Sequence, residues 1–150
     1  MSEPIKGIVT PVKLEYRYTP GAAASRFLRR IETGEYVGQR CPRCKKVYVP
    51  PRGSCPTCGV PTSEDVELAQ TGTITAFCIV NIPFAGQAVE CPYVSATIQL
   101  DGADIGFYHL IQEVPYDQIH IGMRVEAVWK AREEWGPTTE SIAHFRPVSS

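Results

Sequence analysis

Long apolar runs are missing from this sequence. No uninterrupted stretch approaches the roughly 18 to 20 residues that a helix needs to cross a bilayer, and the residues after Met1 do not form a charged start followed by an apolar signal core. Internal repeats and low-complexity segments are missing as well. These absences argue against a membrane protein, a secreted precursor and a repeat architecture, so we expect a soluble cytoplasmic protein without a membrane partner.

Net charge is also nearly absent, at −1, but the two signs are unevenly distributed. Residues 1–52 hold eleven of the fifteen lysines and arginines and four of the sixteen acids, a net charge of +7, whereas residues 53–150 sum to −8. No acid occurs between Glu35 and Glu64. This asymmetry fits a basic N-terminal part that faces anions, joined to an acidic remainder. It equally fits a solvated surface that only aids solubility.

Four of the six cysteines form a metal-binding pattern, C-x2-C-x10-C-x2-C. They are Cys41, Cys44, Cys55 and Cys58. Paired knuckles in a chain without a signal sequence favour a metal site over disulfides. An all-cysteine shell is typical of one structural zinc ion, which keeps no open position for chemistry. Iron in a rubredoxin-like electron carrier is the alternative, although two lysines follow the first knuckle where a redox centre uses glycine.

The pattern along the chain predicts four parts. They are an extended arm over residues 1–20, an amphipathic helix over 21–35, a zinc ribbon over 36–66 and an OB-fold barrel over 67–150. In the helix, Phe27 and Ile31 recur at helical spacing, and Gly34 stands where a helix would end. The ribbon has expected strands at 36–40 and 46–49. Because so small a module buries little core, bound metal would supply its stability.

Five strand-like segments without a convincing helix make up the last part. They are expected at residues 73–80, 93–100, 105–111, 123–129 and 138–145. Strict alternation in the first segment places Ile74, Ala76 and Cys78 on one face, which makes Cys78 a small core residue. Asp101-Gly102 is expected to form the turn between the second and third. Five short strands of this kind predict a mainly β protein that ends in a five-stranded OB-fold barrel.

Catalysis by the chain itself is not indicated. Cys78 and Cys91 are candidate nucleophiles, and His109, His120 and His144 are candidate bases, but no local motif joins them. We therefore predict no catalytic residue.

Binding of single-stranded nucleic acid is the alternative function, because OB-folds often bind single strands. Phe77, Tyr93, Phe107 and Tyr108 are the candidate stacking platforms. A groove that follows phosphates needs positive charge, however, and the barrel lies in the half of the chain that sums to −8.

Several stretches resemble one family. They are GQRCPRCKKVYVPPRGSCPTCG at 38–59, TGTITAF at 71–77, LDGADI at 100–105, IGMRVEAVW at 121–129 and FRP at 145–147. They are similar to the acyl-CoA-associated zinc-ribbon and OB-fold proteins catalogued as domain of unknown function 35. Within that family, FCIVNIPFAGQ at 77–87 most resembles actinobacterial members tied to steroid side-chain breakdown.

The resemblance implies an accessory subunit that assembles with a thiolase-fold enzyme, which supplies the nucleophile. In the steroid-linked relatives the partner is a thiolase-like aldolase that cleaves a hydroxyacyl-CoA side chain. A CoA ester would then be a ligand of the complex, and a dimeric enzyme would carry two copies of this chain in a hetero-tetramer. Those relatives often have a hydratase-type domain ahead of the ribbon, so this chain is expected to be a stand-alone subunit or one domain of a longer protein.

Under this resemblance, four basic residues of the ribbon become candidate contacts. They are Arg40, Arg43, Lys46 and Arg52, which all lie in the acid-free stretch. With Lys45 they leave a zinc-bound ribbon at +3. We expect them to face the phosphates of a CoA ester or an acidic rim of the partner, and the alternative is that they only keep the ribbon soluble.

The loop over residues 81–92 is the other candidate contact. Its apolar stretch is longer than a tight hairpin requires, and Phe84 lies within it. We expect Phe84 to contact the partner or its acyl tunnel, and the alternative is that the loop folds over the barrel mouth.

Overall fold

The computed structural model describes Gly7 and residues 15–148. Most of the predicted arm therefore lies outside the described residues. The helix α1, Ala22–Glu32, buries Phe27 and Ile31 as its spacing predicts. It ends where Gly34 takes a positive φ of 86° and donates its N–H to the carbonyl of Ile31. None of the helices among the described residues is apolar and long enough to span a bilayer.

The ribbon contains a small antiparallel sheet in the order β2-β1-β3. The strands β1, Tyr36–Arg40, and β2, Val47–Tyr48, lie where the sequence predicts them. The strand β3, Glu64–Leu68, was not predicted, and it crosses the expected boundary between ribbon and barrel. It pairs with the whole of β1, from Tyr36 opposite Leu68 to Arg40 opposite Glu64.

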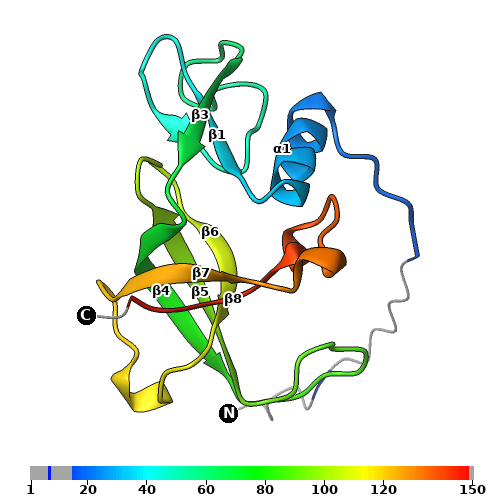
Figure 1. The fold of residues 1–150 in the computed structure, drawn as a ribbon, viewed down its shortest axis with the longest axis vertical. Coiled ribbons are helices and arrows are strands. Elements are labelled where there is room, and N and C mark those ends of the chain that lie inside the picture. The colour runs from blue at the N-terminus through cyan, green and yellow to red at the C-terminus, as the bar shows by residue number, and fades with distance from the viewer. Residues whose placement is uncertain (1–6, 8–14, 149–150) are drawn as a thin grey trace, which may run out of the picture.

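The remaining strands close into a barrel in the order β4-β5-β6-β8-β7, which is the predicted five-stranded architecture (Figure 1). The strands are β4 Thr71–Val80, β5 Tyr93–Leu100, β6 Phe107–Ile111, β7 Arg124–Trp129 and β8 Ile142–Pro147. Single 3-10 turns occupy η1 Tyr116–Gln118, η2 Arg132–Glu134 and η3 Thr139–Ser141. The predicted fifth strand began too early, because residues 139–141 form the turn η3, in which the Thr138 side chain accepts a hydrogen bond from the backbone of Glu140.

The predicted faces of the first barrel strand are wrong beyond Ile74. A bulge between Ile74 and Ala76 leaves Thr75 without a partner in β5, and Ala76 pairs with Thr97. An extra residue in a strand moves every following side chain to the opposite face. Cys78 is consequently exposed on the outside of the barrel and is not a core residue.

Helix, ribbon and barrel share one apolar core. Tyr36 of β1 is 1% exposed, and its ring lies 5.8 Å from that of Phe107 and 5.7 Å from that of Trp129. The turn after β5 also pairs with the ribbon, since Asp104 accepts from the backbone N–H of Val47 at 2.8 Å and donates its own N–H to the Val47 carbonyl at 2.9 Å. The ribbon sheet therefore stands on the end of the barrel beside α1 (Figure 1).

Candidate metal centre

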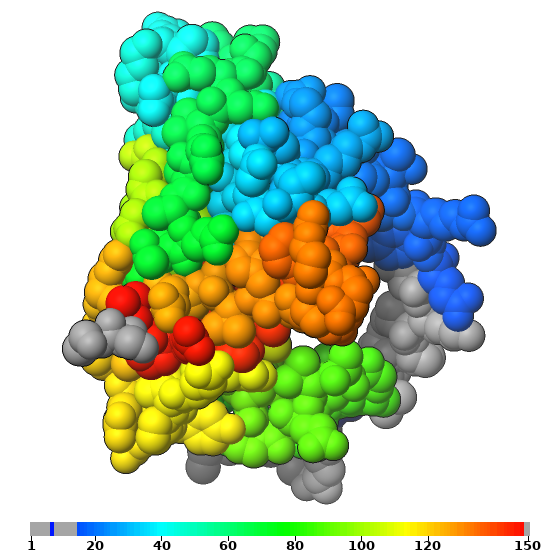
Figure 2. Space-filling model, viewed as in Figure 1, coloured from blue at the N-terminus to red at the C-terminus, as the bar shows by residue number. Residues whose placement is uncertain are grey.

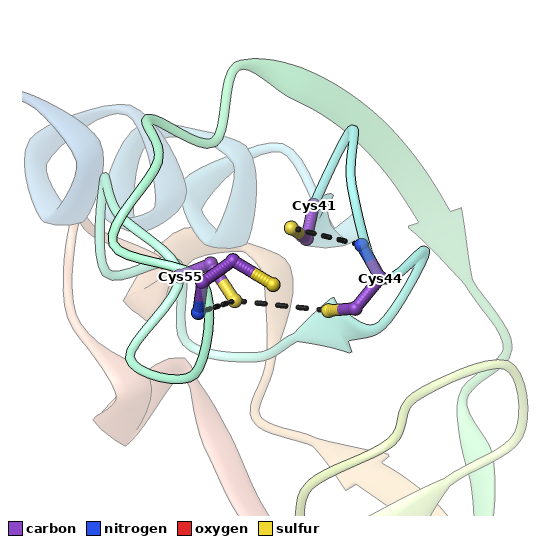
Figure 3. A group of neighbouring side chains, drawn as sticks. Cys41, Cys44 and Cys55 are labelled. Carbon is purple, nitrogen blue, oxygen red and sulfur yellow. Dashed lines mark hydrogen bonds between the residues drawn. The ribbon is translucent and has the colours of Figure 1, made fainter.

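Two knuckles bring four cysteine sulfurs together in the ribbon. The Sγ atoms of Cys41, Cys44, Cys55 and Cys58 all lie within 4.8 Å of one another. In Figure 3 the side chains of Cys41, Cys44 and Cys55 point toward a common centre from the two knuckles. A tetrahedron of sulfurs about 2.3 Å from zinc has edges of about 3.8 Å, and the Sγ atoms of Cys44 and Cys55 are 3.7 Å apart.

The two knuckles have the same backbone geometry. The N–H of Cys44 donates to Cys41 Sγ and the N–H of Cys58 donates to Cys55 Sγ, each at 3.4 Å. The residues after the knuckles, Lys45 and Gly59, both have a φ of 66°. Lys45 thus adopts the left-handed conformation that glycine takes in the second knuckle, so the lysine after the first knuckle does not distinguish zinc from iron, contrary to the sequence argument.

Tyr48 is part of the centre and was not predicted. Its buried hydroxyl lies 3.3 Å from Cys55 Sγ. This hydrogen bond lowers the pKa of the Cys55 thiol to about 6 and raises the pKa of Tyr48 to about 12, as expected when the hydroxyl donates to a thiolate. Desolvation raises the pKa of Cys58 to about 12. This role could not be predicted, because nothing in the sequence distinguishes Tyr48 from the other tyrosines.

The donor set fits zinc in a structural role. Four thiolates so close together repel one another, and a bound dication offsets that repulsion. Cys41 and Cys55 are fully buried, and Val60 and Ile105 pack against them. Four protein sulfurs complete a tetrahedral shell, so zinc bound here would have no position open to a substrate.

The basic candidate residues differ in their surroundings. Arg40 forms an ion pair with Glu64 at 2.9 Å, across the β1–β3 pairing that the sequence did not predict. Arg43, Lys46 and Arg52 are exposed, and within the described part of the chain none of them forms an ion pair. Arg40 therefore already has an acidic partner, whereas no acidic partner of the other three lies among the described residues.

The loop over residues 81–92 is organised by its own polar contacts. Gln87 accepts from the backbone N–H of Phe84 at 3.1 Å and donates to the Val89 carbonyl at 2.8 Å. Phe84 is 62% exposed and Ile82 81% exposed. The two apolar side chains thus point to solvent and do not pack over the barrel mouth.

The candidate nucleophiles and bases do not meet among the described residues. Cys91 is hydrogen-bonded to Gln87, and Cys78 is exposed on β4. His144 contacts Glu113 at 2.8 Å, and this hydrogen bond lowers the pKa of Glu113. His109 is largely buried, which lowers its pKa.

The remaining candidates are equally dispersed. His120 contacts the carbonyl of Gln118 on the surface. Of the four proposed stacking aromatics, Phe107 is buried, Phe77 packs against the core and Tyr93 is half-buried, so Tyr108 is the one of the four with a widely exposed ring, at 78%.

Comparison with known proteins identifies both parts of the chain. The family model for the rubredoxin-like zinc ribbon domain of ChsH2 matches residues 32–64, and the model for the C-terminal OB-fold domain of ChsH2 matches residues 65–130. A solved structure of the Ltp2-ChsH2(DUF35) aldolase contains a chain with a TM-score of 0.66 and 28% identity, and the match covers 87% of this chain and 98% of that one. A DUF35 protein of unknown function from Sulfolobus solfataricus has the same fold, with a TM-score of 0.62 and 17% identity over 85% of this chain and 84% of that one.

Two relatives show how this unit is used elsewhere. A protein of Thermomonospora curvata named "Probable enoyl-CoA hydratase alpha subunit" is 37% identical over 93 residues, which cover 62% of this chain but 28% of that protein. A "DUF35 domain-containing scaffold protein" of Methanocaldococcus jannaschii is 33% identical over 101 residues, which cover 67% of this chain and 71% of the relative. The chain therefore belongs to the DUF35 family, with the zinc ribbon and OB-fold of ChsH2.

Proposed function

We propose that this chain is a non-catalytic accessory subunit of an acyl-CoA enzyme. The observation that carries the proposal is its likeness to the DUF35 chain of the Ltp2-ChsH2(DUF35) aldolase, which covers almost the whole of that chain. The name of the archaeal relative, a scaffold protein, points to the same role. A sulfur shell that would leave zinc no open position fits a chain that contributes structure and contacts.

The finer part of the proposal concerns the partner. We infer a thiolase-like enzyme that cleaves a steroid-derived hydroxyacyl-CoA in a retro-aldol step, with two enzyme subunits and two copies of this chain. In that complex the enzyme brings the nucleophile, and the zinc ribbon and barrel stabilise it and help accommodate the CoA ester.

The test is reconstitution. The chain, isolated with its metal, is mixed with a thiolase-like enzyme recovered with it from its native lysate. Size-exclusion chromatography with light scattering should give a two-plus-two complex, and acyl-CoA cleavage should require both proteins. An enzyme that is equally stable and active alone, and that elutes separately from this chain, would refute the proposal.

The ribbon contacts are tested by charge reversal. Arg43, Lys46 and Arg52 are proposed to face anionic groups, either the phosphates of the CoA ester or an acidic rim of the partner. Arg52→Glu should weaken turnover of the CoA ester or assembly, whereas Arg26→Glu, an exposed reversal on α1, should change neither. Equal behaviour of the two variants would leave the ribbon charge with a role in solubility alone.

The loop contact is tested in the same complex. Phe84→Glu should reduce co-elution with the enzyme without changing zinc content, because Phe84 is exposed and distant in sequence from the ribbon. Full co-elution of this variant would remove Phe84 from the proposed interface.

The alternative function, binding of single-stranded nucleic acid, receives little support. An OB-fold holds a strand across its second and third strands, with basic groups along the backbone. Here β5 and β6 contain no lysine or arginine.

A further inference from the structure

The outer face of β4, β5 and β6 carries no charged side chain. We call this surface the uncharged face. Its residues are Ala76, Cys78 and Val80 on β4, Tyr93, Ser95 and Thr97 on β5, and Tyr108 and Leu110 on β6. The pairing places them side by side, with Ala76 opposite Thr97 opposite Tyr108, and Cys78 opposite Ser95 opposite Leu110. About one residue in five of the chain is charged, so eight neighbouring outward positions without a charge form a distinctive surface.

The uncharged face exists because of the bulge in β4. Thr75 is the extra residue of this bulge. If β4 had no bulge, Phe77 and Ile79 would point outward and Cys78 would point inward. With it, the larger side chains pack against the core, and the small ones, Ala76 and Cys78, lie outside next to Thr97 and Ser95 of β5. Tyr108, on β6 at the side of this surface next to β8, is 78% exposed. Depletion of charge together with an exposed tyrosine is the composition of an interface core.

The surface continues into the loop over residues 81–92 and into a hollow beside it. A cavity of about 550 Å³ opens between Val89 of this loop, Leu110 of β6 and Ile142 of β8, and Lys130 and Glu140 also line it. In Figure 2 the green segment of this loop is separated from the orange segment around residues 130–140, which borders the cavity on its other side. Ile82 and Phe84 stand exposed at the same end of β4.

The size of the surface decides what it can bind. Three strands spaced about 4.8 Å apart and four residues long make a patch of roughly 200 Å², a quarter of the roughly 800 Å² that one partner contributes to a stable interface. The loop must therefore belong to the same interface. A small ligand would fill the hollow beside Tyr108 but leave Ile82 and Phe84 in water, whereas a folded protein subunit would cover all three.

We propose that the uncharged face and the loop over residues 81–92 form the docking surface for the enzyme subunit, which presents an uncharged, largely apolar surface with one projecting apolar side chain that enters the hollow. This inference rests on the proposed function, and the relative described as a scaffold is the reason for choosing an enzyme subunit over a second copy of the chain. Charged residues belong to this surface only outside the uncharged face, with Glu90 in the loop and Lys130 and Glu140 in the wall of the hollow.

Cys78 is a native probe of this surface. Its thiol is exposed on the uncharged face, whereas the four ribbon cysteines would be metal ligands in the zinc-loaded chain. Alkylation of the zinc-loaded chain with iodoacetamide, followed by peptide mass mapping, should modify Cys78 rapidly in the free chain. In the purified complex with the enzyme, the rate should fall at least tenfold. An unchanged rate at Cys78 in a complex that is otherwise intact would overturn the proposal while leaving the proposed function in place.

A variant pair gives the second readout. Tyr108→Glu puts a charge on the uncharged face, beside the hollow, without touching the core, and it should abolish co-elution with the enzyme while zinc content and Tm stay at wild-type values. The control, Val148→Glu, changes an exposed apolar residue that follows β8 and bonds to β7, on the opposite side of the barrel, and it should assemble normally. Wild-type assembly by Tyr108→Glu would overturn the docking surface.

The same alkylation experiment distinguishes the enzyme subunit from two other possible ligands of this surface, an acyl-CoA and a second copy of the chain. Slower alkylation of Cys78 in the isolated chain on addition of an acyl-CoA would show a small-molecule site and overturn the proposal. Slower alkylation that appears with rising concentration of the chain alone would show a contact between copies and overturn it as well. Failure of the wild-type chain to assemble with any thiolase-like enzyme would instead refute the proposed function.

Discussion

Removal of one hydroxyl tests the metal centre most sharply. Tyr48→Phe keeps the ring that packs in the ribbon and deletes the group that lies 3.3 Å from Cys55 Sγ. We expect the variant to fold and to bind zinc more weakly. The reason is that the sulfur loses a hydrogen bond that stabilises its charged form, and no other group replaces it in so buried a position.

The expected loss of zinc affinity follows from the negative charge on the sulfur that accepts this hydrogen bond. A hydrogen bond to a charged group contributes about 1.5–3 kcal/mol, and the loss of an outer partner of a metal ligand weakens metal binding about 10- to 100-fold. At 1.4 kcal/mol for each factor of ten the two figures agree. Competition with a chromophoric zinc chelator at pH 7 measures the ratio of the two dissociation constants directly.

Tyr36→Phe is the matched control. Tyr36 is as buried as Tyr48, but its hydroxyl has no hydrogen-bond partner among the described residues, and burial raises its pKa. Its removal should leave zinc affinity unchanged. Zinc affinity within twofold of wild type for Tyr48→Phe, or an equal loss in both variants, would refute the role given to the Tyr48 hydroxyl.

Three further predictions concern stability. Excess chelator should expose the ribbon to hydrogen exchange before the barrel, because metal binding supplies most of the ribbon's stability; simultaneous exchange of both parts would contradict this. Gly34→Ala should lower stability by about 2–4 kcal/mol in urea unfolding, because alanine is strained at a φ of 86° and its Cβ would lie 2.6 Å from the Trp135 ring; an unchanged midpoint would show that the ring moves freely. The hydrogen bond from Arg124 lowers the pKa of Asp101 from 3.8 to about 2, so this pair stabilises the fold above about pH 4 and the contribution is lost as the pH falls toward 2. This pKa difference corresponds to about 2.4 kcal/mol. The Asp101 side chain is 42% exposed, and solvent screening reduces the contribution to about 1 kcal/mol. Asp101→Asn should therefore lower Tm at pH 7 and not at pH 2.

The ribbon could be predicted closely because its constraint is local. The spacing of the four cysteines fixes both knuckles, and the helix and first two strands follow from short apolar patterns. The strand β3 was missed because Glu64, Asp65 and Glu67 have the composition of a loop. Its pairing with Arg40 and the rest of β1 is a non-local contact, which no window of sequence around Glu64 contains.

The barrel shows a different limit. The five strands and the barrel could be predicted from alternation and turns, but alternation assumes that no residue is inserted. The bulge at Thr75 breaks that assumption and reverses the faces of the rest of β4. Side-chain size carried the missing signal, because Phe77 and Ile79 fill a core better than Ala76 and Cys78 do.

The contacts between ribbon and barrel explain how a chemically closed metal site can matter for assembly. Asp104 pairs with Val47 through two hydrogen bonds, and Val47 is the neighbour of the tyrosine that contacts the metal site. On the other side, Arg132 donates to the carbonyl of Glu32 at 2.7 Å and lies over the Trp135 ring at 4.2 Å, so the segment after β7 is fastened to the end of α1. The metal that orders the ribbon thereby also fixes the direction in which the basic ribbon surface faces relative to the barrel. In the proposed complex, in which both surfaces contact the enzyme, that angle has to be constant, and a tetrathiolate site would contribute to function in this way without taking part in chemistry.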